Sequence, residues 1–188
     1  YEIFLFHEGA CKYLVGNHIY DLQPGDILIM DGTNLHKPYV PANSVYVRSH
    51  IYFSPRWVNS LLKELNATFL LDLFKKMRHF LIRPEEKGEI QYLVNIIRRL
   101  DHVIKAGREN KKYSVVEAKL LLTELLLNID RLGKYGRKNT TENKSNKEIH
   151  AENIATYIQR NYSRKLSLDT IAKDLNSSKS YVSHVFKE

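Results

Sequence analysis

Proline and glycine are concentrated in the front of this chain, and their distribution constrains the fold more than any other feature of the sequence. All five prolines lie at or before position 84, and no glycine follows Gly136. Both residues disfavour the interior of a helix, so the rear of the chain is able to form helices without interruption. The sequence therefore predicts an α+β protein whose strands precede most of its helices.

Residues 1–56 show the pattern of short antiparallel strands. Gly16-Asn17-His18 separates two runs rich in branched and aromatic residues, as a hairpin turn would. Pro24-Gly25-Asp26 is a second turn signal, because Pro presets φ and Gly accepts a positive φ. The expected strands are Tyr1–Glu8, Cys11–Val15, Ile19–Leu22, Ile27–Met30 and Val45–Phe53. This spacing favours a small antiparallel barrel or sandwich.

Two long helices are expected after the strands. In Glu89–Lys105, apolar residues recur at alternating spacings of three and four, as in a coiled-coil seam. These residues are Ile90, Leu93, Ile97, Leu100 and Ile104. Val115–Ile129 is apolar on most of its circumference and has to be buried on more than one side. Either both helices pack on the strands and on each other, or one of them forms the seam of a homodimer. The spacing leaves both alternatives open.

The clearest linker in the chain is Gly133–Lys147, which contains no aliphatic residue and is rich in Asn, Lys, Thr and Ser. It predicts a domain at residues 1–132, a linker at 133–147 and a small C-terminal piece at 148–188. The last 55 residues hold eleven basic and six acidic side chains, which accounts for +5 of the net charge of +8. A basic segment beside a nearly neutral body is typical of a nucleic-acid-binding appendage.

The C-terminal piece predicts three short helices. The first is expected over Ala151–Asn161, the second after the good N-cap Ser167, and the third extends to Lys187. Asn176-Ser177-Ser178 supplies the turn between the last two, since Asn tolerates left-handed backbone. Ala172 is small where the two helices are expected to cross. Two short helices joined by a turn of this length are typical of a helix-turn-helix.

The same residues resemble the first helix-turn-helix of AraC-type bacterial transcription regulators. The similarity covers Leu166–Ala172 and Ser178–Lys187, with the tyrosine, the branched residue after it and the Phe-Lys ending as the distinctive parts. The N-terminal part is similar to the cupin sensor of that family. Its matching residues are Tyr1 to Phe4, Gly16, Tyr20 to Asp26, His36 and Phe53.

The resemblance implies a cytoplasmic, ligand-responsive transcription regulator that acts as a homodimer on double-stranded promoter or operator DNA. Residues 1–132 would form a cupin-like antiparallel β-barrel with packed helices for ligand sensing and dimerisation. Residues 148–188 would form the first helix-turn-helix of a DNA-binding domain that is truncated before its second one. The expected DNA contacts are Lys179, Ser180, Ser183 and His184 in the major groove, with Lys187 and Arg164 on phosphates.

Aromatic residues are frequent in the expected strands, and aromatic faces suit a small-molecule effector such as a sugar. Most of these rings are expected to fill the core, and a few to line a pocket. The residues that we expect to bind the effector are Tyr13, Tyr20, His36, Arg48 and His50.

Two other classes of function compete with this reading. Cupin barrels also serve metal-dependent enzymes, but no His-x-His pair, nucleophile motif or phosphate-binding Gly loop occurs here. The sequence therefore predicts no enzyme, metal site or cofactor. A protein-interaction module that uses the basic helices is the second alternative. Cys11 is the single cysteine and the chain contains no apolar run of membrane-spanning length, so we expect no internal disulfide and no membrane span.

Overall fold

The computed structural model describes residues 1–77, 79–107, 111–135 and 146–185. Its contacts separate the chain into two compact units. The first unit contains residues 1–10, 23–33 and 44–140, and the second contains 11–22, 34–43 and 141–188. The expectation of a mixed α+β protein with antiparallel sheets is confirmed. The domain boundaries drawn from the linker remain a prediction.

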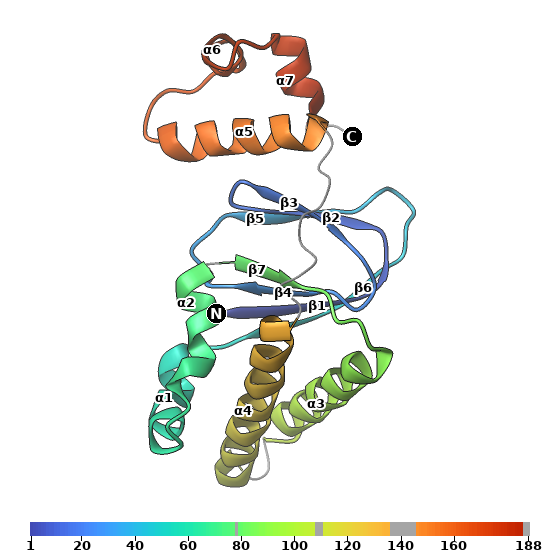
Figure 1. The fold of residues 1–188 in the computed structure, drawn as a ribbon, viewed down its shortest axis with the longest axis vertical. Coiled ribbons are helices and arrows are strands. Elements are labelled where there is room, and N and C mark those ends of the chain that lie inside the picture. Colours follow the sequence, from blue (N-terminus) through green and yellow to red (C-terminus); the bar gives the residue numbers. More distant parts are fainter. Residues whose placement is uncertain (78, 108–110, 136–145, 186–188) are drawn as a thin grey trace. The chain divides into compact units, whose positions relative to one another are not determined.

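A four-stranded antiparallel sheet in the order β6-β1-β4-β7 forms the centre of the first unit (Figure 1). Its strands are β1 (Glu2–Gly9), β4 (Ile27–Met30), β6 (Tyr46–Tyr52) and β7 (His79–Ile82). Glu2 lies opposite Met30 on one side and opposite Tyr52 on the other. The inner strands β1 and β4 are buried over successive residues, Glu2–Phe6 and Ile27–Met30.

Helices of the first unit cover one face of this sheet (Figure 1). They are α1 (Pro55–Glu64), the 3-10 turn η1 (Thr68–Leu71), α2 (Asp72–Met77), α3 (Lys87–Ala106) and α4 (Lys111–Tyr135). Alternate residues of the inner strands point toward the helices and join one apolar core with them. That core includes Ile3, Leu5, Ile27, Ile29, Val58, Leu62, Phe74, Leu93, Leu100, Leu122 and Leu125.

A buried ion pair connects the turn before β4 to the end of β7. Asp26 accepts hydrogen bonds from Arg83 Nε at 2.8 Å and from Arg83 Nη2 at 2.7 Å. Its carboxylate also accepts one from the backbone N–H of Gln23 at 2.8 Å, which closes the turn around Gly25, whose φ is +99°. Two segments far apart in the chain are therefore held by one buried carboxylate.

The second unit combines a three-stranded antiparallel sheet with three helices. The sheet has the order β3-β2-β5, with β2 (Cys11–Val15), β3 (His18–Leu22) and β5 (His36–Tyr39). The helices are α5 (Asn146–Asn161), α6 (Leu168–Asp174) and α7 (Lys179–Val185). The backbone N–H of Ile19 on the edge strand β3 donates to Glu152 Oε1 at 2.9 Å, and the Ile19 side chain packs against the helical core.

Three details differ from the sequence expectations. The apolar seam of α3 faces the core at Leu93 and Leu100, so most of it is used within the chain, and Ile104 alone of the five is strongly exposed. The expected linker 133–147 overlaps helix at both ends, because α4 continues past Gly133 where the helix packs against Leu73. The strand expected over Val45–Phe53 forms at Tyr46–Tyr52, and the register of its partner β1 shifts between Phe6 and Glu8. No helix in the described ranges has the length and apolar character needed to cross a membrane.

Candidate functional site

Helices α6 and α7 are each started by a serine. Ser167 has extended backbone and its Oγ accepts the backbone N–H of Thr170 at 3.1 Å, which caps α6. Ser178 Oγ accepts the backbone N–H of Tyr181 at 3.1 Å in the same way at the start of α7. These local side-chain contacts fix where each helix begins, as the sequence predicted.

The turn between the two helices depends on Asn176, whose φ is +50°. Asn accepts this left-handed conformation more readily than most residues. The chain then reverses so that the backbone N–H of Ser177 donates to the carbonyl of Ala172 at 2.8 Å. The tight reversal brings α7 against α6.

A small apolar core holds α5, α6 and α7 together. It consists of Ala151, Ile154, Ile171, Ala172, Val182 and Val185, all buried. Ala172 is buried at the crossing of α6 and α7, where a larger side chain would separate the helices. The hydroxyl of Tyr157 on α5 donates to Asp174 Oδ2 at 2.5 Å, and this hydrogen bond raises the pKa of Tyr157 above its ordinary value.

The residues expected to contact DNA lie on the polar side of this three-helix group. Lys179, Ser180 and His184 are exposed on α7, Ser183 is half-buried beside them, and Arg164 is exposed before α6. Lys187 lies outside the described residues. Sequence reasoning missed Asp169, whose Oδ2 lies 2.9 Å from Lys179 Nζ. Both side chains are exposed, so this pair is weak and leaves the lysine available to a phosphate.

Three of the five residues expected to bind the effector lie on the three-stranded sheet. Tyr13 is buried and lies opposite Tyr20 in the register of β2 and β3. The ring of Tyr13 stacks on His36 with centroids 6.2 Å apart. His36 Nδ1 lies 3.0 Å from the carbonyl oxygen of Asn34, so the ring is oriented by its own loop.

The other two lie on β6 of the four-stranded sheet, opposite Phe4 and Phe6 of β1. His50 Nδ1 lies 2.8 Å from Oε1 of Glu2, which is only 1% exposed. His50 Nε2 is buried and has no hydrogen-bond partner among the described residues. Arg48 is exposed, with its guanidinium carbon 4.9 Å from the centre of the Tyr46 ring.

Glu2 is the residue of this face that sequence reasoning did not place in the effector site. Its carboxylate orients His50 by the contact described above and also influences Tyr52. Burial is the main cause of the raised pKa of Tyr52, and the charge of Glu2 raises it further. A carboxylate directly before the apolar run Ile3–Phe6 was the available signal. Within the described ranges, no three His, Cys, Asp or Glu side chains converge to hold a metal ion.

The first unit is thus an antiparallel sheet covered by helices on one face, and the second unit ends in a compact group of three helices. The family model for the AraC-like ligand binding domain matches residues 1–126. That match covers well over half of the chain, and the chain therefore belongs to the AraC-like ligand-binding domain family.

A solved structure with similarity to the chain is the crystal structure of the AraC-like transcriptional activator CuxR. The two are 13% identical with a TM-score of 0.42, and the alignment covers 99% of this chain and 60% of that one. The present chain thus spans about three-fifths of the length of that protein. No curated protein matches the chain.

Proposed function

We propose that this chain is the sensor and a DNA-reading unit of a ligand-responsive, DNA-binding transcription regulator that acts in the cytoplasm without enzymatic activity. One observation carries the proposal. Two serine-capped helices, α6 and α7, meet at a tight turn over a small core, in a chain whose front belongs to the AraC-like ligand-binding domain family. Neither the helix pair nor the ligand-binding domain alone would distinguish a transcription regulator from a protein that only binds a ligand.

Helix α7 is the reading element in this proposal. Its exposed Lys179, Ser180 and His184 carry donors and acceptors of a length suited to base edges in the major groove, and Ser183 borders them. Arg164 precedes α6 and is exposed, as a phosphate contact has to be. Lys187 has the same proposed role on the basis of sequence.

The effector is a small polar molecule in this proposal, with sugars among the candidates. The candidate binding residues are Tyr13, Tyr20 and His36 in the second unit and Arg48 and His50 in the first. Support comes from the stacked rings of Tyr13 and His36 and from the buried, unpartnered Nε2 of His50. A buried nitrogen that lacks a partner costs free energy, and an effector hydroxyl that donates to it would recover that cost. The effector regulates DNA binding only if it prefers one arrangement of the chain, since equal affinity for two states shifts neither.

The homodimer forms through α4 in this proposal. Tyr113, Val116 and Leu120 recur at spacings of three and four on α4, and Val116 and Leu120 are 55% and 54% exposed. The apolar seam of α3, in contrast, is largely buried in the core of the first unit, at Leu93 and Leu100. An exposed apolar stripe of this spacing suits a two-helix contact with a second copy of the chain.

Fluorescence anisotropy with duplex DNA tests the DNA-binding proposal. Duplexes enriched from a randomised pool by the chain are titrated at several salt concentrations. Binding should weaken steeply with salt, because each neutralised phosphate releases counterions. His184→Ala should change which duplexes are preferred, Lys187→Ala should weaken binding to all of them, and Lys173→Ala on the exposed side of α6 serves as the control. Binding without salt dependence would instead indicate a protein-interaction module.

A further inference from the structure

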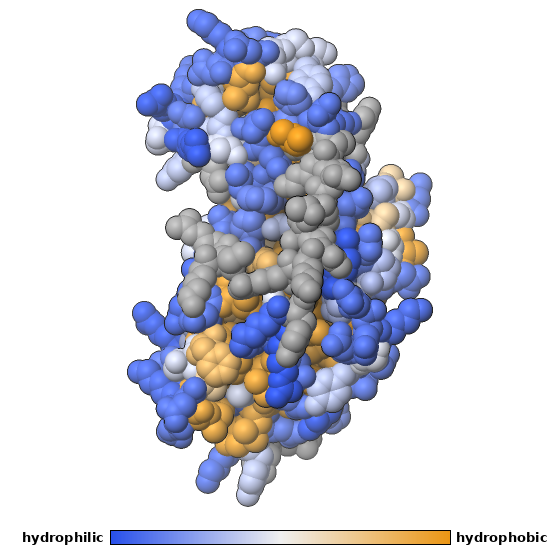
Figure 2. Space-filling model, in the orientation of Figure 1, coloured by the Kyte–Doolittle hydropathy of each residue, from blue (hydrophilic) through white to orange (hydrophobic). Residues whose placement is uncertain are grey.

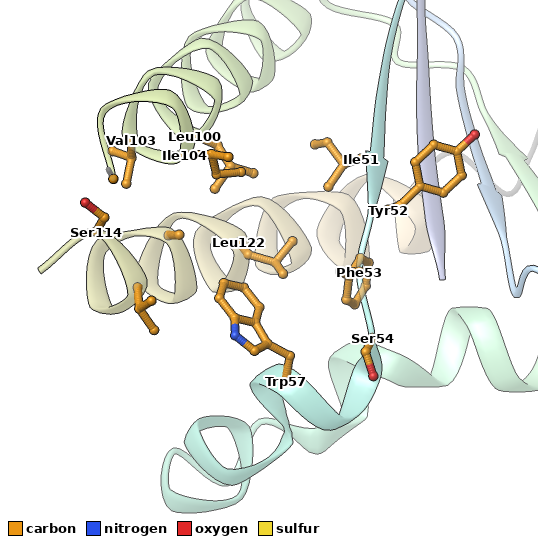
Figure 3. A pocket seen from close by; sticks show the side chains of 13 residues that line it. Ile51, Tyr52, Phe53, Ser54, Trp57, Leu100, Val103, Ile104, Ser114 and Leu122 are labelled. Carbon is orange, nitrogen blue, oxygen red and sulfur yellow. The ribbon is translucent and has the colours of Figure 1, made fainter. Parts of the chain in front are cut away.

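An apolar groove opens on the helical side of the first unit, and Tyr52 at its edge stacks on His50 with ring centroids 5.7 Å apart. It lies among α1, α3, α4 and the end of β6 (Figure 3). Phe53, Leu100, Val103, Ala118 and Leu122 are its buried walls. In Figure 3 the Trp57 side chain extends from α1 toward Leu122 on α4, and Figure 2 shows apolar surface over α1 and α4 among polar side chains.

The size and composition of this groove are those of a small-molecule site. Its volume is about 570 Å³, which falls within the range of roughly 300–1,000 Å³ that is usual for ligand pockets. The rim is also apolar, because Trp57 and Ile104 remain 38% and 64% exposed there. Side chains of this kind are normally covered, so the groove favours an occupant with a hydrocarbon body.

The end of the groove near α1 is electrically positive. Helix α1 starts at Pro55 after Ser54, whose side chain makes no capping hydrogen bond, and the first turn contains no acidic residue. The helix dipole gives this end a partial positive charge, although Pro55 has no N–H and the Trp57 N–H already donates to the Ser54 carbonyl at 2.9 Å. Independently, Lys119 of α4 places its Nζ 5.6 Å from the centre of the Trp57 ring, which lies in that first turn.

We propose that this groove binds a hydrophobic carboxylate, with the hydrocarbon body between α3 and α4 and the anionic group between Lys119 and the start of α1. The two positive features and the apolar walls meet at Trp57, so a ligand that is apolar at one end and anionic at the other satisfies all of them. The exposed hydroxyl of Ser54 provides one further donor for the carboxylate.

A second copy of the chain is a poorer occupant because the groove and the exposed stripe are on different sides of α4. At 100° per residue, Val115, Ala118 and Leu122 occupy one side of the helix, and Val116 and Leu120 lie on nearly the opposite side. A dimer built on the stripe therefore leaves the groove open. The groove proposal does not depend on the dimer or on DNA binding.

Trp57 is the single tryptophan of the chain, so its fluorescence reports directly on the groove. The 188-residue chain is titrated with phenylhexanoate, phenylhexanol and phenylhexylamine, which share a body and differ in the charge of the head group. We expect phenylhexanoate to shift the Trp57 emission to the blue and to bind on the order of tenfold more tightly than the alcohol. The amine should bind more weakly than both.

Lys119→Met keeps the apolar stem and removes the charge, and it should reduce phenylhexanoate binding to the level of the alcohol. Lys112→Met, which removes an exposed charge from the same helix outside the groove, should leave binding unchanged. Ile104→Glu should abolish binding by placing an anion at the rim. The proposal would be overturned if the three probes bound equally well, or if Lys119→Met bound phenylhexanoate as tightly as the unchanged chain. It would also be overturned if the Trp57 emission responded to protein concentration and to no probe.

Discussion

The ion pair between Asp26 and Arg83 should be a main determinant of the stability of the first unit. Asp26 is 1% exposed, and all the contacts described for its carboxylate are to Arg83 and the backbone N–H of Gln23. Asp26→Ala removes the carboxylate that accepts from the guanidinium and from this N–H. Arg83→Met has the more severe effect, because it leaves a carboxylate buried with one described donor remaining.

The exposure of the two partners sets the expected magnitudes. Breaking a buried pair by removing one partner costs about 3–5 kcal/mol, and we expect Arg83→Met to fall in this range. The Arg83 side chain is 32% exposed and is partly solvated when Asp26 is removed. We therefore expect Asp26→Ala to cost less, about 2–3 kcal/mol. The double variant should cost less than the sum of the two, because neither partner is then left alone.

Urea unfolding followed by Trp57 fluorescence measures these free energies, since Trp57 lies in the same unit. With a slope of about 1–3 kcal/mol per M, the Asp26→Ala midpoint should fall by about 0.7–3 M. Costs below about 1 kcal/mol for both single variants, as for a surface pair, would refute the reasoning. Additive costs would refute it as well, because they would show that the two side chains do not interact.

Three further predictions concern other contacts. Glu152→Ala removes the acceptor of the Ile19 N–H. Hydrogen exchange at the Ile19 amide should then accelerate about tenfold, as expected for a hydrogen bond worth about 1.4 kcal/mol. Unchanged exchange would mean that the contact does not form in solution. Val116→Glu should give a monomer by analytical ultracentrifugation while Ile104→Glu keeps the dimer, and the reverse result would place the seam on α3. Burial and the nearby charge of Arg98 lower the pKa of His7 below about 6.5 in the folded chain, so the unfolded chain takes up a proton first as the pH falls. Stability is then full above about pH 6.5 and decreases below it, and His7→Gln should flatten this part of a thermal-unfolding profile against pH.

Local signals in the sequence were sufficient for the start of α6 and for the turn between α6 and α7. Ser167 caps α6 within three residues, Asn176 takes the left-handed turn, and Ala172 lies at the helix crossing. Each of these depends on atoms only a few residues apart, so the residue types alone predict them. The hairpin of β2 and β3 belongs to the same class, because Gly16, with φ at +59°, closes it over a short distance.

Only the tertiary structure decided the parts that depend on distant pairing. Strand β7 joins the sheet beside β4, and nothing in His79–Ile82 by itself distinguishes an edge strand from a loop. Strand β5 has four residues and contains Pro38, which is acceptable at an edge and conceals the strand from a sequence pattern.

The same limit applies to the functional surfaces. The pairing of Glu2 with His50, 48 residues apart, depends on the register of β1 and β6. Apolar spacing marked α3 as a possible seam, but the fold buried most of that seam and left the stripe of α4 exposed. A repeating pattern shows that a helix has an apolar face, whereas the partner of that face depends on which elements the whole chain brings beside it.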